Sequence, residues 1–349
     1  MIHECRADSI ENINGNTALD IHIKERGIQK TDIVSVKHWQ SASGEYRFSI
    51  VTKADVGINE ESIFSQVNDL ISKHSPDYTE LIRTQNEKGN KNLLVINPAD
   101  IHIGKYSAEK ETGEAYNSEI AVKRVIDGIH GLLEKSKGFE IEKILFCIGN
   151  DVLHTDTPYS TTCKGTYVDS AGKWWEHFEV ALELYIKCVE ILRKIAPVDC
   201  IHSLSNHDYQ AGFHLAQALK AWFRKADDIS VEVSPAHRSY YTYGENLIGL
   251  EHGDSAKIDR LPLLMAQERS KEWSATKFRY WYLHHIHHKV KHKWLDGKDF
   301  IGVSVEYLRS PSSSDSWHSR KGFTGINKAV EAFIHSKKEG QIARITHYF

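Results

Sequence analysis

A repeating pattern in residues 91–349 constrains the fold more than any other feature of the sequence. Short apolar runs recur there, and a cluster of polar residues follows each one. The runs lie at 92–96, 143–148, 199–204, 246–250 and 277–283. Amphipathic stretches such as 118–136 and 174–195 lie between them, and after residue 289 the pattern is β-like again. This alternation predicts an α/β fold whose binding groups lie at the strand ends.

The first 90 residues lack this pattern. Two β-type runs, 33–39 and 46–52, are joined there by a Ser/Gly turn. We therefore predict a small N-terminal α/β appendage of unknown role over residues 1–90. Residues 91–349 would form the main domain, and a total of 349 residues suits this division.

The composition narrows the class of protein. Hydrophobic residues make up 40% and charged residues 26% of the chain, which excludes disordered, collagen-like and disulfide-scaffold proteins. A formal net charge of -3 argues against a uniformly basic surface but leaves room for a local basic groove. The chain has no secretory-type N-terminus, no long apolar stretch and no C-x-x-C pair among its five cysteines. We expect a cytoplasmic protein that does not enter membranes.

Histidine is the compositional anomaly, at 21 of 349 residues, and this excess prompts a search for a metal site. The polar clusters that follow the apolar runs contain suitable side chains. They are Asp100 and His102, Asp151 and His154, Asn206 with His207 and Asp208, His252, and His285 with His287.

These residue types suit a site for two metal ions. Carboxylate oxygen and imidazole nitrogen bind hard or borderline divalent ions, and two neighbouring ions need a shared anionic ligand. Asp151, after a central strand, is the natural shared ligand. With Asp151 used twice, seven groups give four ligands to each ion and leave room for a bridging hydroxide and a phosphate. The seven are Asp100, His102, Asp151, Asn206, His252, His285 and His287.

The order of the motifs is Asp-x-His, Gly-Asn-Asp, Asn-His-Asp, His-Gly and His-x-His. It resembles that of the calcineurin-like metallophosphoesterase superfamily over residues 92 to about 290. The resemblance implies a four-layer α/β/β/α sandwich of two mixed sheets with two metals at the carboxyl ends of the strands. One metal would take Asp100, His102, Asp151 and His287. The other would take Asp151, Asn206, His252 and His285.

Asp151-x-x-His154 further resembles the branch that contains the SbcD-type DNA repair exonucleases. This resemblance implies manganese-dependent cleavage of DNA by a metal-bridging hydroxide, with a possible ATPase partner subunit and a possible homo-oligomer. Iron or zinc would also suit the ligands. A phosphatase or nucleotide phosphodiesterase acting on a small substrate is the first alternative. A silent scaffold that keeps the metal site is the second.

Three positions depart from the superfamily pattern. Asn150 stands between Gly149 and Asp151, and Ser205 replaces the glycine usual before Asn206. His284 stands where glycine normally precedes His-x-His, so the run 284–288 admits two registers. Strand-end spacing and the superfamily phase favour His285 and His287 as the ligands.

Two histidines and an aspartate are candidate catalytic residues. We expect His207 to act as a general acid at the leaving oxygen, with Asp208 orienting its ring. His154 would assist cleavage of diesters, although a supporting or surface role is the alternative. These three residues complete the catalytic set that the motifs predict.

Several further residues are candidate substrate contacts. The long segment 155–175 would overhang the metals and bring Lys164 and Tyr167 to the substrate, unless it is only a crossover loop. Lys289, Lys291 and Lys293 alternate and would form a basic ridge along DNA, or else a solvated strand face. We expect Trp174 and Trp175 in the core rather than on a base-stacking platform. Residues 310–322 are Ser-rich and read as a flexible loop.

Overall fold

The computed structural model describes residues 2–7, 28–40, 46–52, 91–286, 297–322 and 327–349, together with eight single positions, 20, 23, 24, 26, 78, 81, 83 and 325. Two compact units make up the chain, Met1–Ser75 and Pro76–Phe349. Tyr78 and Arg83 belong to the second unit, where the Arg83 guanidinium donates to the carbonyl oxygen of Arg193. The predicted boundary at residue 90 stays a prediction, because residues 84–90 lie outside the described part.

The first unit contains a three-stranded antiparallel sheet in the order β1-β3-β2. Its described elements are β1 (Ile2–Ala7), η1 (Lys30–Asp32), β2 (Ile33–Gln40) and β3 (Tyr46–Thr52). Strands β2 and β3 coincide with the two β-type runs of the sequence. Strand β1 was not anticipated, and it pairs with β3 from the start of the chain.

A six-stranded mixed sheet lies at the centre of the second unit, in the order β14-β13-β4-β5-β6-β7. Strands β4 to β7 run parallel, while β13 and β14 are antiparallel to their neighbours. The bounds are β4 (Asn92–Ile96), β5 (Ile141–Gly149), β6 (Val198–Ser203), β7 (Ile229–Glu232), β13 (Ala329–Ser336) and β14 (Gly340–Tyr348).

A second, five-stranded mixed sheet has the order β11-β12-β10-β9-β8. Strands β9, β10 and β12 are parallel, and β8 and β11 pair antiparallel at the two edges. The bounds are β8 (Ser239–Tyr243), β9 (Asn246–Leu250), β10 (Phe278–Leu283), β11 (Gly297–Phe300) and β12 (Val303–Tyr307).

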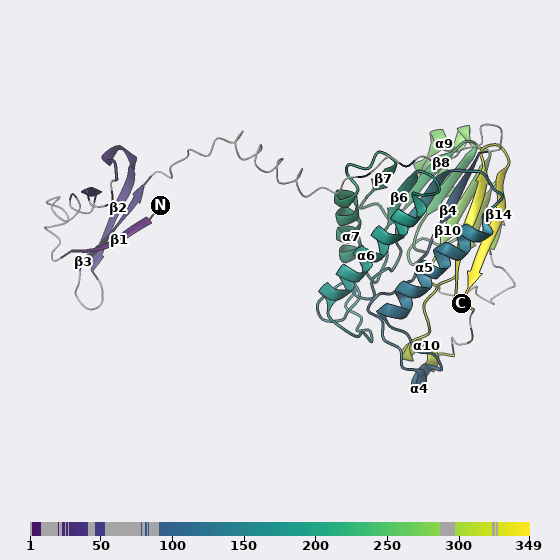
Figure 1. The fold of residues 1–349 in the computed structure, drawn as a ribbon, viewed down its shortest axis with the longest axis horizontal. Helices are drawn as coiled ribbons and strands as arrows, with labels where there is room; N and C mark the ends of the chain where they lie inside the picture. The colour runs from purple at the N-terminus through teal and green to yellow at the C-terminus, as the bar shows by residue number, and fades with distance from the viewer. Residues whose placement is uncertain are drawn as a thin grey trace. The chain divides into compact units, whose positions relative to one another are not determined.

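Helices cover the outer faces of the two sheets. Three of them, α5, α6 and α7, pack on the six-stranded sheet (Figure 1). Helix α8 packs on the five-stranded sheet. The bounds are α4 (Glu109–Thr112), α5 (Ser118–Lys135), α6 (Trp174–Leu192), α7 (Tyr209–Trp222), α8 (Leu261–Glu268), α9 (Ser270–Ala275) and α10 (Ser316–Arg320).

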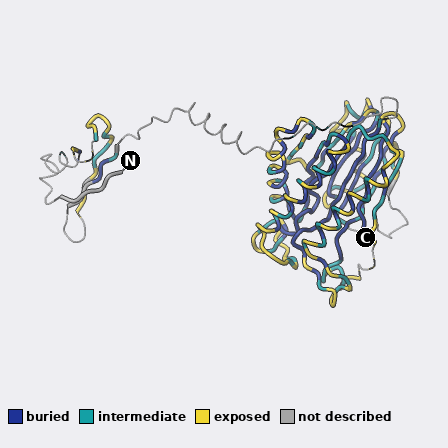
Figure 2. The backbone as a smooth tube through the Cα atoms, viewed as in Figure 1, coloured by how far each residue is buried: buried dark blue, intermediate teal, exposed yellow. Residues whose placement is uncertain are grey.

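The side chains of β4 point alternately into two cores, and this explains how the sheets and helices form layers. Leu93 and Val95 belong to the core between the two sheets, whereas Leu94 and Ile96 belong to the core beneath the helices. Successive side chains of a strand point to opposite faces, so a strand buried on both faces is apolar throughout. All five residues of β4 are buried, as Figure 2 shows for the central strands as a group. The predicted four-layer α/β/β/α sandwich is confirmed.

Within the described residues, we find no helix whose length and apolar character would let it cross a membrane.

Leu145 tests the core between the sheets. Its side chain is fully buried there, so Leu145→Ala should lower the free energy of unfolding by about 2–5 kcal/mol. Leu263→Ala on α8 is the matched control, since that leucine is 73% exposed and its loss should change stability by less than about 0.5 kcal/mol. Urea denaturation of both variants gives the comparison. Equal losses would contradict the inter-sheet core.

Candidate metal centre

Five parallel strands deliver the predicted ligands to one edge of the sandwich. In the six-stranded sheet, Asp100, Asp151 and Asn206 follow the carboxyl ends of the adjacent parallel strands β4, β5 and β6. In the other sheet, His252 and His285 follow the adjacent parallel strands β9 and β10. Parallel strands end on the same side of a sheet, so residues up to 185 positions apart meet there.

Left-handed backbone turns the chain sharply at these strand ends. We call the short segments that directly follow β4, β5, β6, β9 and β10 the ligand loops. Of the non-glycine residues with positive φ in the described part of the chain, all but Ser160 belong to them. They are Asp100, His102, Asn150, Asp151 and His285, with φ between 52° and 69°. Such conformations cost about 1–3 kcal/mol each and persist where the surroundings fix them.

Hydrogen bonds between the loops hold this backbone in place. The amide of Asp100 donates to the carbonyl oxygen of Asn150 at 2.8 Å, and that of His102 donates to Asp151 O at 2.9 Å. The Asp151 amide donates to Ser205 Oγ, also at 2.8 Å. Asn150 is the extra residue relative to the superfamily pattern, and asparagine tolerates the left-handed conformation well. The loops after β4, β5 and β6 therefore form one hydrogen-bonded unit.

One group of ligand atoms surrounds His252 Nε2. His252 Nε2 lies 3.0 Å from Asp151 Oδ2, 2.9 Å from Asn206 Oδ1 and 3.2 Å from His285 Nδ1. Ligand atoms that each lie about 2.1 Å from a shared ion are roughly 3 Å apart. The three distances from His252 Nε2 therefore match those between atoms of one coordination shell, and the four atoms belong to the four residues predicted for one metal.

A second group contains Asp100, His102 and Asp151, all of them buried. Their ligand atoms lie within 4.8 Å of one another, close enough to hold a metal ion. The fourth predicted ligand, His287, lies outside the described residues. Asp151 is common to both groups, which is the arrangement expected of a shared ligand.

The run of histidines after β10 contributes His285 to the centre. His285 Nδ1 faces His252, and its backbone N–H donates to Asp100 Oδ2 at 3.2 Å. His284 is completely buried, and its backbone amide pairs with the carbonyl oxygen of His252. The side chains of these neighbours therefore occupy different environments, with His285 in the ligand group.

Two carboxyl groups of the centre, those of Asp100 and Asp208, have too little positive charge beside them to offset their burial. Burial, reinforced by the Asp151 charge, raises the pKa of both Asp100 and Asp208 to about 7. Burial also raises the pKa of Asp151, but His252 and His207 outweigh it and hold that pKa well below its ordinary value. For His252, burial lowers the pKa while Asp151 and Asp100 raise it, to about 9 overall. A divalent cation would supply the missing charge, so the donor set fits a metal.

His207 lies beside the ligand groups and is only partly buried. Its backbone N–H donates to Asp151 Oδ1 at 2.8 Å, and its ring Nδ1 lies 2.9 Å from the carbonyl oxygen of His154. A carbonyl oxygen can only accept, so Nδ1 carries the proton and Nε2 is the other reactive ring atom. The ring also contacts that of His102, with centroids 4.6 Å apart.

The structure corrects the expected role of Asp208. We expected its carboxylate to orient the His207 ring, but His154 O does so instead. The Asp208 carboxylate accepts hydrogen bonds from the Ser205 hydroxyl and from the backbone N–H of Leu153, at 2.9 Å for the latter. It is 2% exposed. Asp208 therefore ties the loop after β5 to the loop after β6.

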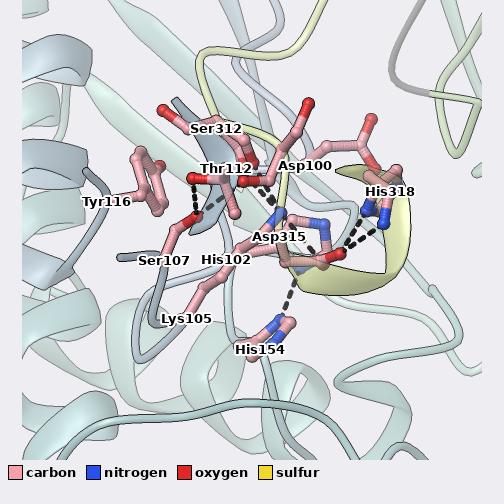
Figure 3. Close-up of polar contacts among 12 residues, drawn as sticks. Asp100, His102, Lys105, Ser107, Thr112, Tyr116, His154, Ser312, Asp315 and His318 are labelled. Atoms are coloured by element: carbon pink, nitrogen blue, oxygen red, sulfur yellow. Dashed lines mark hydrogen bonds and ion pairs between the residues drawn. The ribbon is translucent and has the colours of Figure 1, made fainter. Parts of the chain in front are cut away.

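His154 is buried against His102, with their Nδ1 atoms 3.3 Å apart (Figure 3). Burial lowers the pKa of His154 well below its ordinary value, so its ring is neutral. His102, His154 and His207 also form a cluster whose nitrogen atoms could hold an ion. A surface position, one of the alternatives for His154, is excluded by this burial.

The predicted substrate contacts are distributed unevenly. Lys164 is exposed, and its Nζ lies 3.8 Å from Asp254 Oδ2, two residues beyond His252. Its neighbour Cys163 donates its backbone N–H to Asn206 O at 3.2 Å, so this part of the segment 155–175 touches a ligand loop. Tyr167 is 70% exposed. Lys289, Lys291 and Lys293 lie outside the described residues.

Residues 310–316, which we name the strap, are not the flexible loop expected from their composition. Ser310 Oγ donates to Asp100 O at 2.8 Å, and the ammonium of Lys105 donates to Ser313 O at 2.7 Å. Lys105 is 1% exposed. Its ammonium also pairs with Asp315 (Figure 3). These polar partners hold the strap against the loop that carries Asp100 and His102.

Three further residues that hold the ligand loops in place were not predicted from the sequence. Tyr185, on α6, accepts the backbone N–H of Gly149 at 2.8 Å, and no motif marks it. Ser205 was noted only as a replacement of the usual glycine, yet its hydroxyl accepts the backbone N–H of Asp151 and donates to the Asp208 carboxylate. Lys105 had one available signal, since it directly follows the Asp-x-His-x-Gly segment.

Comparisons with known proteins add little to this geometry. No protein-family model and no curated protein matches the chain. Two crystal structures of Vps29 from Chaetomium thermophilum, one complexed with a cyclic peptide, are similar over 74% of this chain and 96% of theirs. Sequence identities are 10% and 9%, each with a TM-score of 0.27. We draw no conclusion about this chain from a TM-score of 0.27.

Thermal unfolding at different pH values tests the metal centre. The raised pKa values of Asp100, Asp208 and His252 stabilise the ion-free fold at low pH, and this stabilisation is lost as pH rises through about 7 to 9. Bound metal displaces these protons, so excess Mn²⁺ should raise Tm more at about pH 8.5 than at about pH 6.

The control for this measurement is Asp151→Asn, which removes the shared carboxylate and should abolish most of the Mn²⁺ effect. Scans in EDTA give the ion-free reference at each pH. A wild-type Tm that does not respond to Mn²⁺ at either pH would argue against the centre.

Proposed function

We propose that the chain is a metal-dependent phosphodiesterase of the calcineurin-like superfamily whose substrate is DNA. One observation carries the proposal: Asp151 belongs to two adjacent groups of ligand atoms, with Asp100 and His102 on one side and His252 and His285 on the other. Two cations that share a carboxylate are a recurrent device for in-line displacement at phosphorus. The motif order in the sequence supports the same superfamily.

The donor set assigns the residues that would hold the ions. Asp100, His102 and Asp151 would hold one ion, and Asp151, Asn206, His252 and His285 the other; manganese is our first choice among the divalent metals that N/O ligands accept. Two bound ions would polarise the phosphate oxygens and lower the pKa of the attacking water.

The remaining chemistry belongs to the protein. An oxygen of water forms a bond to phosphorus while the bond to the leaving oxygen breaks, and that oxygen needs a proton. His207 is suited to deliver it from Nε2 when both ring nitrogens carry a proton, because His154 O holds the Nδ1–H and leaves Nε2 as the atom that gives up its proton. His154 supports a diester substrate through its contact with the His102 ring, in line with its motif position.

Hydrolysis of bis-p-nitrophenyl phosphate tests the phosphodiesterase directly. Mn²⁺-dependent turnover is expected in the wild type and none in EDTA. Asp151→Asn should lower kcat/KM more than about 100-fold, because loss of even an outer-shell partner of a metal costs 10–100-fold. Wild-type protein that binds Mn²⁺ yet leaves the diester intact would refute the phosphodiesterase and favour a scaffold or a monoester substrate.

Labelled single-stranded and double-stranded DNA test the finer part of the proposal. Cleavage of DNA that depends on Mn²⁺ is expected, whereas turnover of the small diester alone would indicate a nucleotide phosphodiesterase. His154→Ala should then reduce DNA cleavage more than it reduces metal content.

His207→Ala tests the proton donor. We expect kcat to fall by about 10²–10⁴-fold with bound metal retained. His130→Ala is the matched control, since His130 is an exposed histidine on α5, remote from the ligand loops. Metal content by atomic spectroscopy separates loss of catalysis from loss of the ions. Full turnover in metal-loaded His207→Ala would rule out this role.

A further inference from the structure

A cavity of about 320 Å³ is lined in part by Leu153 and Thr155, the two neighbours of His154 in the chain. Its walls come from the loop after β5, including Thr155 and Pro158, and from the first turns of α6 and α7. Two larger cavities lie elsewhere. One is lined by residues at the amino ends of β4 and β5, opposite the ligand edge, and the other lies between α5 and α6.

Residues 154–156 connect this cavity to the metal centre. His154 O accepts the ring N–H of His207, and two residues later Asp156 Oδ1 accepts the backbone N–H groups of Gln210 and Ala211, at 2.9 and 2.7 Å. Asp156, Gln210 and Ala211 all line the cavity. Two residues span at most about 7 Å. The cavity is therefore within reach of a group attached to a phosphate at the centre.

Aromatic side chains form the wall on the α6 side. Trp174 and Phe178 are four residues apart on α6, so they lie on the same face of the helix, and both line the cavity. Trp174 is 54% and Trp175 48% exposed, which corrects our expectation that both lie in the core. Tyr159, next to the lining residue Pro158, is 80% exposed. Trp174 is therefore the accessible aromatic ring in the wall of the cavity.

The rim adds polar groups to this apolar wall. Thr157, Gln210 and His214 line the cavity together with the carboxylate of Asp156. An amide and a carboxylate can pair with the edge of a base, and an aromatic ring can stack on its face. At about 320 Å³, the cavity is at the small end of the range for small-molecule sites, which is the size of a single base with its sugar.

We infer that this cavity binds a nucleobase of the strand whose phosphate lies at the metal centre. The inference rests on the proposed function and specifies its substrate class as nucleotide diesters with an unpaired base. Trp174 provides the stacking surface, and the polar rim meets the base edge. Stacking on an aromatic ring is largely indifferent to base identity, so the site selects for a base rather than for a sequence.

Two diesters with the same leaving group test the inference: p-nitrophenyl thymidine 5′-phosphate and methyl p-nitrophenyl phosphate. The ratio of their kcat/KM values isolates the contribution of the nucleoside. Trp174→Ala should lower this ratio about tenfold, and Trp174→Phe should restore most of it. Trp222→Ala, at the far end of α7 and 42% exposed, is the matched control and should leave the ratio unchanged. An unchanged ratio in Trp174→Ala would overturn the inference.

A binding measurement separates this inference from the proposed function. Fluorescence anisotropy in EDTA compares labelled hexathymidylate with an abasic strand of the same length. We expect wild type to prefer the base-bearing strand about tenfold and Trp174→Ala to lose that preference. If the wild type hydrolyses neither diester but shows this preference, the phosphodiesterase fails and the base site stands. Equal affinity of the wild type for the two strands would overturn the base site.

Discussion

Burial of the Asp151 carboxylate is the constraint on which the rest of the centre depends. The side chain is inaccessible to water, and a buried carboxylate is unfavourable unless positive charge and donors surround it. His252 and the amide of His207 meet this demand from two different loops. Ser205, in the same loop as His207, accepts the backbone N–H of Asp151 through its hydroxyl oxygen. The two sheets must therefore stack with their ligand-bearing edges together.

The fold and the convergence of the described candidate ligands could be predicted because both follow from local pattern. Apolar runs such as 92–96 are buried on both faces, and a parallel sheet brings their carboxyl ends to one side. Residues directly after those runs, Asp151 among them, had to meet there. The partner of Asp208 could not be predicted, since His207 and Ser205 both lie within three residues of it in the sequence. The backbone conformation decided between them.

Predictions from composition and hydrophobic pattern were wrong where polar groups are buried or aromatic groups are exposed. The strap is Ser-rich and reads as solvated, but Lys105 and the Asp100 carbonyl supply partners from about 210 residues earlier in the chain. Trp174 opens an amphipathic pattern and reads as core, yet as the first residue of α6 it precedes the turns that pack. Hydrogen bonding over long sequence separations, and the position of a residue along its helix, are not encoded in hydrophobicity.

The bond from Ser310 to the Asp100 carbonyl has a consequence for the order in which the protein is made. Ribosomes release the Asp100 loop early, but the strap and β13, which pairs with β4, follow more than 200 residues later. A nascent chain that stops short of the strap already carries every described ligand residue, but it lacks the contacts of Ser310 and Ser313 with the Asp100 loop. The last part of the candidate centre to be made is therefore a support of its first loop and not one of its described ligand residues.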